Sequence, residues 1–477
     1  MKKIISNIVS AAVMVIVSTA PVFAQNNLGV VCCGCPLVSD RPTMDLAIYA
    51  DASGNLGLDG NILQSLVLDC KTTWILSKKI YVPAGLSITI KPGTLIRATD
   101  VSDAAALIIT KGGKIFAQGH PLGGPIVFTA ADDPMDGKYC EQGKWGGVVL
   151  LGKACNNLTA ANVSGSGFGI SPGIGFIEGF LSIEARNQYG MAPGMCDDND
   201  NSGIMSYVSI RHAGDIVGPS NELNGLTLAS VGRGTWLDHI EVLYNLDDGI
   251  EFFGGTVDLN YAIVMYCADD SFDWDQGWRG RGQYWASVHS NIAQQAGDNG
   301  LEGDNDDEAT GAAPFSNPTI SNATFLGNGG EAAIRAKEAT RGKILNSFFV
   351  NFGAGFSMSN ITLGNQDDVY KKWKDNFFVV KSCTFFPAPN SLLITGTAVA
   401  TSPAADSAKF FNQDLNVGTN TVPPPADTLH SLPCGHFAAD KFNLVPNPIL
   451  GNTVILPLDG FFKPVNYRGA FKSGEKP

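Results

Sequence analysis

The chain has 477 residues and a formal net charge of −13, with 45 acidic against 32 basic side chains. An acidic surface repels nucleic acid and anionic membranes, so we expect no nucleic-acid partner. Only 16% of the residues are charged, whereas the chain holds 55 glycines and 26 phenylalanines. This composition favours a turn-rich all-β protein over a helical one.

The first residues have the pattern of a secretory signal peptide. Two lysines precede an apolar stretch from Ile8 to Val17, and the small side chains of Val22 and Ala24 mark a cleavage site. The apolar stretch is too short to cross a bilayer comfortably, which argues against a membrane anchor. We therefore expect residues 1–24 to be removed and the protein to be secreted or displayed at the cell surface.

Ten cysteines fit an exported protein, because disulfides persist in oxidising compartments. The cluster at residues 32–35 is compatible with a metal site, but disulfides are favoured in such a chain. Cys140 and Cys155 flank one short segment and are the first pair that we expect. Cys383 with Cys434 is the second.

The middle of the chain repeats itself. Asn245–Phe252 matches Cys267–Trp274 at an offset of 22 residues, and Ser87–Ile96 resembles Leu107–Phe116 at an offset of 20. Each unit contains very short strands joined by turn residues, without helical periodicity. The units from the middle of the chain onward share an apolar residue between a small and a polar one, at Leu226, Ile250, Phe272, Leu301, Ile334 and Phe356.

A repeat of this length predicts the coil of a solenoid, in which each apolar residue points inward and stacks on its counterpart one coil away. The leucine-and-asparagine signature of leucine-rich repeats is absent, and a propeller blade would be longer. We predict an all-β, right-handed parallel β-helix over residues 80–386. An N-terminal cap with the cysteine cluster, residues 25–79, precedes it, and a C-terminal loop or capping segment, residues 387–477, follows.

Six motifs follow one another along the chain: Trp145–Ala154, Asp197–Gly203, Asn221–Leu228, Val231–Thr235, Asp247–Gly255 and Asn466–Phe471. In these motifs, over roughly residues 80–471, the chain resembles a family of exported right-handed parallel β-helix proteins of Bacteroidota. The resemblance implies export and surface association, leaves room for outer-membrane or surface partner proteins, and carries no settled activity. Similar proteins tend to continue past the last motif, which leaves open whether this sequence is a fragment.

Two acidic segments have the composition of calcium loops. Oxygen-bearing side chains alternate from Asp198 to Ser202 before Gly203, an arrangement that suits hard cations. An EF-hand would need Glu where Ser209 lies, so this loop is of another kind. We expect Ca²⁺ to stabilise the protein, the alternative being hydrated surface corners. The expected metal ligands are Asp197, Asp198, Asp200, Asp304 and Asp306.

Acidic side chains also recur on the outward side of the predicted coils. If Ile250, Phe272 and Leu301 point inward, the residues that follow them point outward on three successive coils. We interpret this stripe as a binding face for an extracellular polymer, most simply a glycan. Two tryptophans nearby would either stack on sugar rings or fill the coil. The predicted ligand-binding residues are Glu251, Asp273, Asp275, Trp278, Trp285 and Glu302.

The same stripe allows an enzymatic alternative, because carboxylates on neighbouring coils have the separation that glycosidases use. Pectin-degrading β-helix hydrolases carry paired aspartates, Gly-His-Gly and Arg-x-Lys on successive coils. This sequence resembles them in the paired aspartates and in Arg335–Lys337, but it has no His between His289 and His430. We favour binding over a polysaccharide lyase or glycoside hydrolase. In that alternative the catalytic residues would be Asp247, Asp270, Asp273, Glu302, Arg335 and Lys337.

Overall fold

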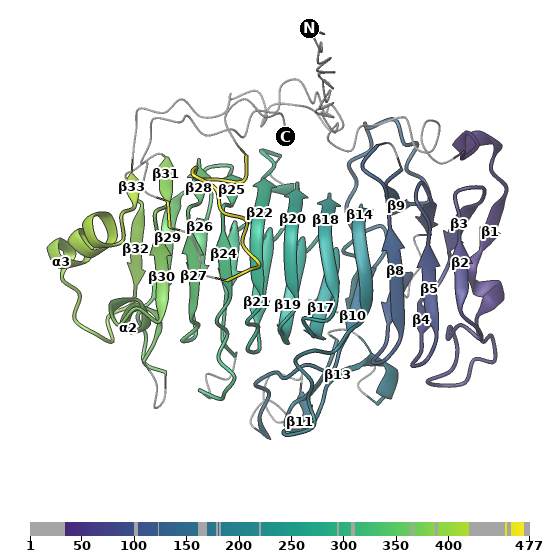
Figure 1. Cartoon of the computed structure of the whole chain (residues 1–477), viewed down its shortest axis with the longest axis horizontal. Coiled ribbons are helices and arrows are strands. Elements are labelled where there is room, and N and C mark those ends of the chain that lie inside the picture. The colour runs from purple at the N-terminus through teal and green to yellow at the C-terminus, as the bar shows by residue number, and fades with distance from the viewer. Residues whose placement is uncertain are drawn as a thin grey trace, which may run out of the picture.

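The structure, a computed structural model, is a right-handed parallel β-helix (Figure 1). Among the residues that it describes, no helix is long and apolar enough to cross a membrane. The predicted signal peptide and residues Cys32, Cys33 and Cys434 lie outside the described part. The structure describes residues 34–99, 104–122, 124–160, 169–177, 180, 183–218, 221–292, 295–306, 311–363, 367–386, 390–418, 454–455 and 459–471.

One side of the helix is a ten-stranded parallel sheet to which each coil contributes one strand. The inward positions of these strands are apolar, and their neighbours along the strand face outward. The strands are β4 (Ile80–Val82), β7 (Ala106–Ile109), β10 (Gly147–Leu151), β17 (Leu226–Val231), β19 (Ile250–Gly255), β21 (Phe272–Asp275), β23 (Leu301–Gly303), β26 (Ala332–Ala336), β29 (Ala354–Ser359) and β32 (Leu392–Thr395).

The rest of each coil belongs to an eighteen-stranded sheet, in which most coils contribute two short strands. The outer coils hold β1 (Thr43–Asp45), β2 (Leu66–Leu68), β3 (Thr73–Leu76), β5 (Ser87–Ile90), β6 (Leu95–Ala98), β8 (Lys114–Gln118), β9 (Ile126–Ala130), β24 (Thr319–Ser321), β25 (Thr324–Leu326), β27 (Gly342–Leu345), β28 (Phe348–Val350), β30 (Phe378–Lys381), β31 (Thr384–Phe386) and β33 (Val417–Gly418). Between them lie four long strands, β14 (Gly203–Arg211), β18 (Trp236–Leu243), β20 (Asp258–Met265) and β22 (Arg281–Val288).

Each long strand bends at one residue with a positive φ, namely Tyr207, His239, Tyr261 or Tyr284. The backbone therefore turns from one flat part of the coil to the next while the strand stays continuous. In the following coils the corresponding bend separates two short strands and is occupied by Asn322, Asn346 or Ser382. Asparagine and histidine are enriched in this conformation, so the three tyrosines in it stand out.

The interior confirms the predicted inward column. Leu226 pairs with Ile250, Ile250 with Phe272, Phe272 with Leu301, and the register continues through the next two coils to Phe356. All six side chains of this column are 0% exposed. Their burial removes apolar surface from water at about 25 cal/mol per Å², which makes this column a main source of stability.

The β-helix is longer at both ends than we predicted from the sequence. β2 already pairs in parallel with β5, and β1 with β3, so regular coils begin within the segment expected to be a cap. At the other end β32 pairs with β29 and β33 with β31, beyond residue 386. These terminal strands are only two to four residues long and are separated by irregular loops, so they lack the full repeat that marked the middle coils.

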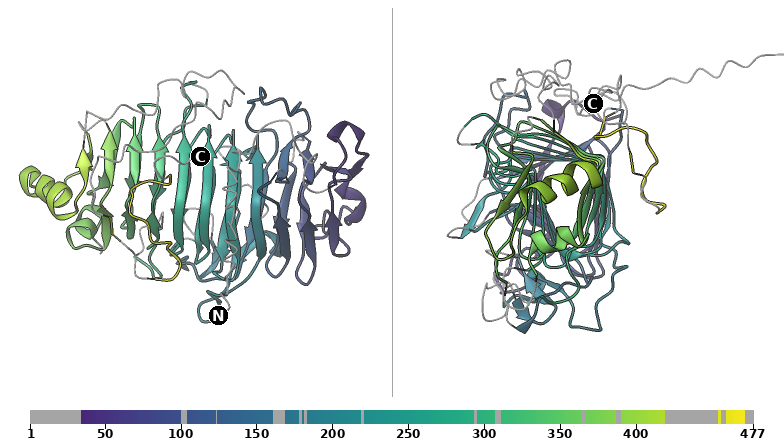
Figure 2. Two further views of the ribbon diagram at one scale, coloured as in Figure 1. Left: turned by 45° about the horizontal axis from the view of Figure 1, so that its top comes forward. Right: turned by 90° about the vertical axis from the view of Figure 1, so that its left-hand side faces the viewer.

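Short helices flank the two ends of the helix. The turns η1 (Val38–Asp40) and η2 (Leu46–Tyr49) lie at the N-terminal end. The helices α2 (Val369–Lys374) and α3 (Pro403–Ala408), with the π-helical turn η5 (Lys409–Gln413), lie at the other end, where they cross the last coil in the end view (Figure 2). A C-terminal strap, residues 459–471, runs outside the coils and is fixed there by Arg468, which donates to the carbonyl of Cys383.

Disulfides are present, but not in the pairs that we expected. Cys35 is bonded to Cys70, and Cys155 to Cys196, whereas Cys383 is a free thiol buried in the core. Cys140 is also in a disulfide. The expectation was wrong because closeness along the chain says little about closeness in a solenoid, whose neighbours lie one coil away.

Candidate functional site

An acidic row runs along the outer face of the ten-stranded sheet. Glu251 on β19 pairs in register with Asp273 on β21. Glu302 follows on β23, because Phe272 and Leu301, the residues before Asp273 and Glu302, are partners, and Glu302 in turn pairs with Arg335 on β26. Parallel strands are about 4.8 Å apart, so three carboxylates and one guanidinium are placed side by side. This outcome agrees with the direction in which the sequence predicted them to point.

A ladder of side chains supports the row at the corner that precedes it. The carboxylate of Asp248 accepts a hydrogen bond from the backbone N–H of Asp270, one coil away, at 2.9 Å. Asp270 in turn accepts from the N–H of Asn299, and Asn299 from the N–H of Ala332 at 3.1 Å. The ladder residues Asp248, Asp270 and Asn299 are all buried. Asp270, which would be catalytic in the enzymatic alternative, is a hydrogen-bonded member of the corner in the structure.

Two sets of carboxylates converge closely enough to share a cation. The carboxylate oxygens of Asp248, Glu251 and Asp273 lie within 4.8 Å of one another, as do those of Asp247, Asp248 and Asp269. Hard cations such as Ca²⁺ bind sets of oxygen ligands of this kind. The arrangement therefore fits a divalent cation at the point where the ladder meets the row.

Without a cation, these groups hold protons more tightly than ordinary carboxyls. Burial raises the pKa of Asp273 well above its usual value, and the charges of Glu302 and Asp304 raise it further. Burial likewise raises the pKa of Asp248 and of Asp270, each with help from neighbouring acids. Protonation or a bound cation would therefore reduce the repulsion between these carboxylates.

Lys337 and Arg335 supply the positive charge beside the row. The Nζ atom of Lys337 lies 2.9 Å from Glu302 and 3.2 Å from Asp304, and Arg335 Nε lies 3.2 Å from Glu302. Burial opposes protonation of Lys337, but Asp304 and Glu302 outweigh it and raise the pKa of this amine. Both cations therefore act on Glu302, the last acid of the row.

A flap of three antiparallel strands covers the part of the sheet next to the row. It consists of β11 (Gly169–Ser171), β12 (Ile174–Phe176) and β13 (Gln188–Gly190). The short helix η3 (Ala185–Asn187) comes directly before β13. Tyr189 on the flap packs with outward residues of the earlier coils and with Phe253, and its hydroxyl donates to Gln276 at 2.7 Å. The flap thus covers the apolar coils and reaches Phe253 on β19, the strand of Glu251. A separate hairpin is formed by β15 (Ile216–Gly218) and β16 (Asn221–Glu222).

The predicted sugar contacts of Trp278 and Trp285 are wrong. Both side chains are 0% exposed and lie inside the coil, where Trp278 stacks on Phe252 at 3.9 Å and Trp285 on Phe272 at 4.3 Å between ring centroids. Asp275 does face outward, but it is buried beside Asp304. The chain reverses its inside-outside alternation at the corners, so residues near a corner cannot be assigned a direction from spacing alone.

The acidic loop at residues 197–203 is held by protein partners. Both oxygens of Asp198 accept from Arg279, each at 2.6 Å, and Asp198 also accepts from the N–H of Cys155. Asp200 accepts from the N–H of Lys153, and Asp197 from that of Asn199. Neither of the converging carboxylate sets found among the described residues includes Asp197, Asp198, Asp200, Asp304 or Asp306. A calcium ion at these residues stays a prediction.

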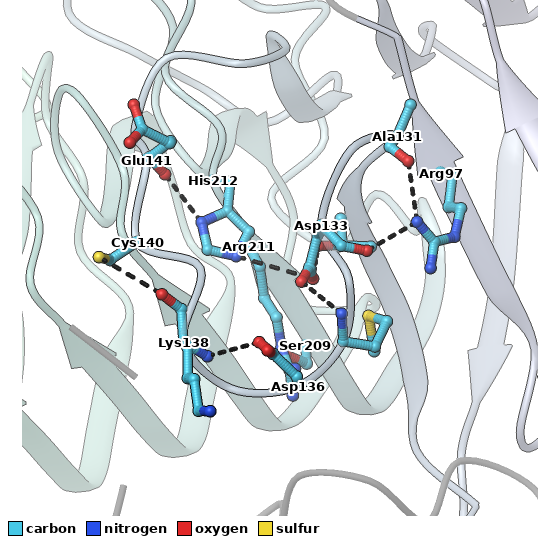
Figure 3. Close-up of polar contacts among 12 residues, drawn as sticks. Arg97, Ala131, Asp133, Asp136, Lys138, Cys140, Glu141, Ser209, Arg211 and His212 are labelled. Carbon is cyan, nitrogen blue, oxygen red and sulfur yellow. Dashed lines mark hydrogen bonds and ion pairs between the residues drawn. The ribbon is translucent and has the colours of Figure 1, made fainter. Parts of the chain in front are cut away.

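A polar cluster that the sequence did not reveal lies beneath the loop between β9 and β10 (Figure 3). The buried ring of His212 donates from Nδ1 to the carbonyl of Glu141 at 2.8 Å, and its Nε2 lies 3.8 Å from Asp133. Burial lowers the pKa of His212 to about 4, against the pull of Asp133. Nearby, Arg211 pairs with the buried Glu241 at 3.3 Å. The imidazole is therefore neutral and structural.

A comparison with protein families gives one match. The model for a pectate-lyase-like beta helix domain matches residues 60–420. No curated protein and no solved structure matches the chain. The matched range includes the acidic row, the ladder and the flap, and it agrees with the extended limits of the β-helix.

Proposed function

Because this chain belongs to the family of pectate-lyase-like β-helix domains, we propose that it binds an extracellular polysaccharide along the acidic row. The family fits a polysaccharide-related role. The observation that carries the proposal is the row of Glu251, Asp273 and Glu302 in register on adjacent coils. A polymer laid along the helix axis would meet one side chain of the row about every 4.8 Å.

The charge of the row suggests how such a polymer is held. Asp248, Glu251 and Asp273 would hold a divalent cation, most simply Ca²⁺, which supplies the positive charge that an acidic polymer needs next to an acidic protein. Lys337 and Arg335 would bind a carboxylate or hydroxyl of the polymer at the other end of the row. The cation at one end of the row and the basic side chains at the other would therefore bind different groups of one polymer molecule.

Two features support a place outside the cytoplasm. The pattern of residues 1–24 is that of a signal peptide, and the disulfides Cys35–Cys70 and Cys155–Cys196 would persist in an oxidising compartment. Secretion or surface display would bring the acidic row into contact with extracellular polymers.

A second candidate function, cleavage of the polysaccharide, is favoured by one observation. The raised pKa of Asp273 would keep this carboxyl protonated where an ordinary one is ionised, as a general acid requires. Glu302 one coil away could then act as the second carboxylate, at the short separation used by retaining glycosidases. We rank binding first because two of the acids with a raised pKa, Asp248 and Asp270, accept backbone hydrogen bonds in the corner ladder.

One experiment separates the two functions. Purified protein is titrated with polygalacturonate, alginate and neutral xylan, with and without Ca²⁺, while reducing ends are measured in the same samples. We expect saturable, Ca²⁺-dependent binding of an acidic polymer without new reducing ends. Asp273→Asn and Glu302→Gln should each weaken binding at least tenfold, whereas Asp40→Asn, the same change on an exposed residue near the N-terminal end, should not.

Equal binding by wild type and Asp273→Asn would contradict the proposal. New reducing ends that disappear in Asp273→Asn would establish cleavage instead. Circular dichroism of each variant confirms that the β-helix is intact, so that loss of binding is not loss of fold.

A further inference from the structure

Trp236 differs from every other tryptophan of the chain. Its side chain is 62% exposed on β18, in the middle of the eighteen-stranded sheet. An exposed tryptophan offers a flat apolar ring with an N–H donor at its edge, and such residues are enriched at binding surfaces. The other six tryptophans are buried: Trp74, Trp145, Trp274, Trp278, Trp285 and Trp373.

Trp236 is the last apolar residue in a row of outward side chains on five successive coils, and its partner in register on the next coil is Asp258. The pairs in register are Val67 with Thr89, Thr89 with Phe116, Phe116 with Ile204, and Ile204 with Trp236. Val67 at the far end is 58% exposed, and the three residues between are partly exposed. The row is apolar apart from Thr89 and follows the helix axis.

A second outward row beside Trp236 carries hydrogen-bonding groups in fixed positions. Asp238 accepts from His239 Nδ1 at 2.5 Å and from the hydroxyl of Ser206 at 2.9 Å. The ring of His239 is stacked between Tyr207 and Tyr261, with centroid distances of 4.2 and 4.4 Å. Its Nε2 lies 3.3 Å from the Tyr207 hydroxyl. The three rings are thus held in one stack, and each of them is partly exposed.

Beside this surface Arg281 is paired with acids, and Lys463 contacts a tyrosine hydroxyl. Arg281 lies 2.5 Å from Asp258 and 3.3 Å from Asp459 of the strap, and its guanidinium also covers Phe461. Lys463 of the strap donates to the Tyr261 hydroxyl at 2.7 Å. Burial would raise the pKa of Asp238, but the hydrogen bond from His239 and the charge of Lys463 together lower it. The surface therefore favours a ligand without net charge.

We propose that Trp236 and the Tyr207–His239–Tyr261 stack form a second carbohydrate site, for a neutral β-linked pyranose chain. The apolar face of one sugar would stack on the indole. The hydroxyls of that sugar and its neighbour would bond to Asp238 and to the edges of the stack. The extended chain would follow the apolar row, with roughly one sugar for each coil spacing of about 4.8 Å. The site shares no residue with the acidic row and is independent of the function proposed for that row.

The exposure of a single tryptophan gives a direct measurement. Acrylamide quenches an exposed indole much more than a buried one, so collisional quenching of the intact protein reports on Trp236. We expect cellohexaose, xylohexaose or mannohexaose to reduce the quenching constant at least twofold, with saturation. Trp236→Ala should remove both the accessible component and the effect, whereas Tyr207→Phe should weaken the effect by removing one hydroxyl.

The design distinguishes this site from the acidic row. The Asp273→Asn/Glu302→Gln variant should keep the quenching response to neutral oligosaccharides, and polygalacturonate should give none in wild type. Absence of protection by all three oligosaccharides at millimolar concentration would overturn the proposal. Quenching that falls with protein concentration alone would overturn it as well, because the surface would then be a contact between copies of this chain.

Discussion

The carboxylate of Asp248 accepts the backbone N–H of Asp270 at 2.9 Å, so that each coil is tied to the next by a carboxyl group enclosed in the corner. The bond needs an acceptor oxygen but not a negative charge. Asn299 is the next residue of the same ladder, and its uncharged amide oxygen accepts the backbone N–H of Ala332 in the same way. The site therefore contains acids whose charge is a cost to the fold.

Asp270→Asn should stabilise the protein in a chelator at pH 8. Burial and the nearby Glu302 raise the pKa of Asp270, so ionising it above that pKa works against the native state. The amide keeps the acceptor oxygen, and we expect a gain of about 1–3 kcal/mol in the free energy of unfolding. Urea denaturation with EDTA measures it.

The sign of the pH dependence provides the control. Because the folded pKa is raised, native Asp270 binds the proton more tightly, and its contribution to stability is lost as pH rises through the folded pKa. The advantage of Asp270→Asn should therefore vanish near pH 4. Asn299→Asp, the reverse change one coil away, should destabilise the protein at pH 8. A loss of stability in Asp270→Asn with EDTA present would refute the role given to the ladder.

His212 should make the protein sensitive to mild acid. Its pKa is about 4 in the folded state and 6.5 in the reference state, so the unfolded chain binds more protons in between. Stability contributed by the neutral imidazole is present above pH 6.5 and is lost as pH falls toward 4, by up to about 3 kcal/mol. His212→Phe keeps the ring against Tyr244 but cannot titrate.

The variant should be less stable than wild type at pH 8, because the hydrogen bond to Glu141 is lost, by about 1 kcal/mol. Its deficit should shrink or reverse at pH 5. A deficit that stays constant between pH 8 and pH 5, measured in parallel urea titrations, would mean that His212 does not titrate in this range.

The sequence predicted the β-helix and the outward direction of the acidic row for one physical reason. A solenoid stacks equivalent residues, so the match of Ile250 with Phe272 and of Phe252 with Trp274 is a register that the structure reproduces. The 20-residue offset failed, because it aligned strands of different faces. Ser87 pairs with Lys114, not with Leu107.

What the sequence could not reveal depends on contacts between distant segments. The pairing of Asp198 with Arg279 joins residues 81 apart, and no local pattern distinguishes such a carboxylate from a metal ligand. The stack of Tyr207, His239 and Tyr261 had a visible signal, an aromatic residue at the same step of successive strands. The bend places these rings outside the alternation of the strand, so the strand pattern does not predict their direction.

Lys337→Met should destabilise the protein by about 1–3 kcal/mol at pH 8, because it leaves Glu302 and Asp304 enclosed without their shared partner. Arg335→Met removes the same charge from a side chain that is 46% exposed, and its cost should stay below about 1 kcal/mol. The deficit of Lys337→Met should diminish in acid, because burial raises the pKa of Asp304 and this carboxyl is then protonated. Equal deficits for the two variants at pH 8 would show that the burial of Lys337 does not affect the free energy of unfolding.

The acidic loop and the acidic row should respond differently to calcium. Asp198 already has both oxygens bound by Arg279, so a cation there would have to replace the guanidinium. Asp198→Asn should cost about 1 kcal/mol through loss of this partly exposed pair. The cost should be the same with Ca²⁺ as with EDTA.

Asp273→Asn should behave in the opposite way. Asp273 shares a set of converging oxygens with Asp248 and Glu251, and a cation bound only to the native state adds about 2.7 kcal/mol at a hundredfold excess over its dissociation constant. Wild type should therefore melt at a higher temperature with Ca²⁺ than with EDTA, and Asp273→Asn should lose most of that difference. If Asp198→Asn abolished the calcium response and Asp273→Asn left it intact, the ion would belong to the loop, and Arg279 would have to move away to admit it.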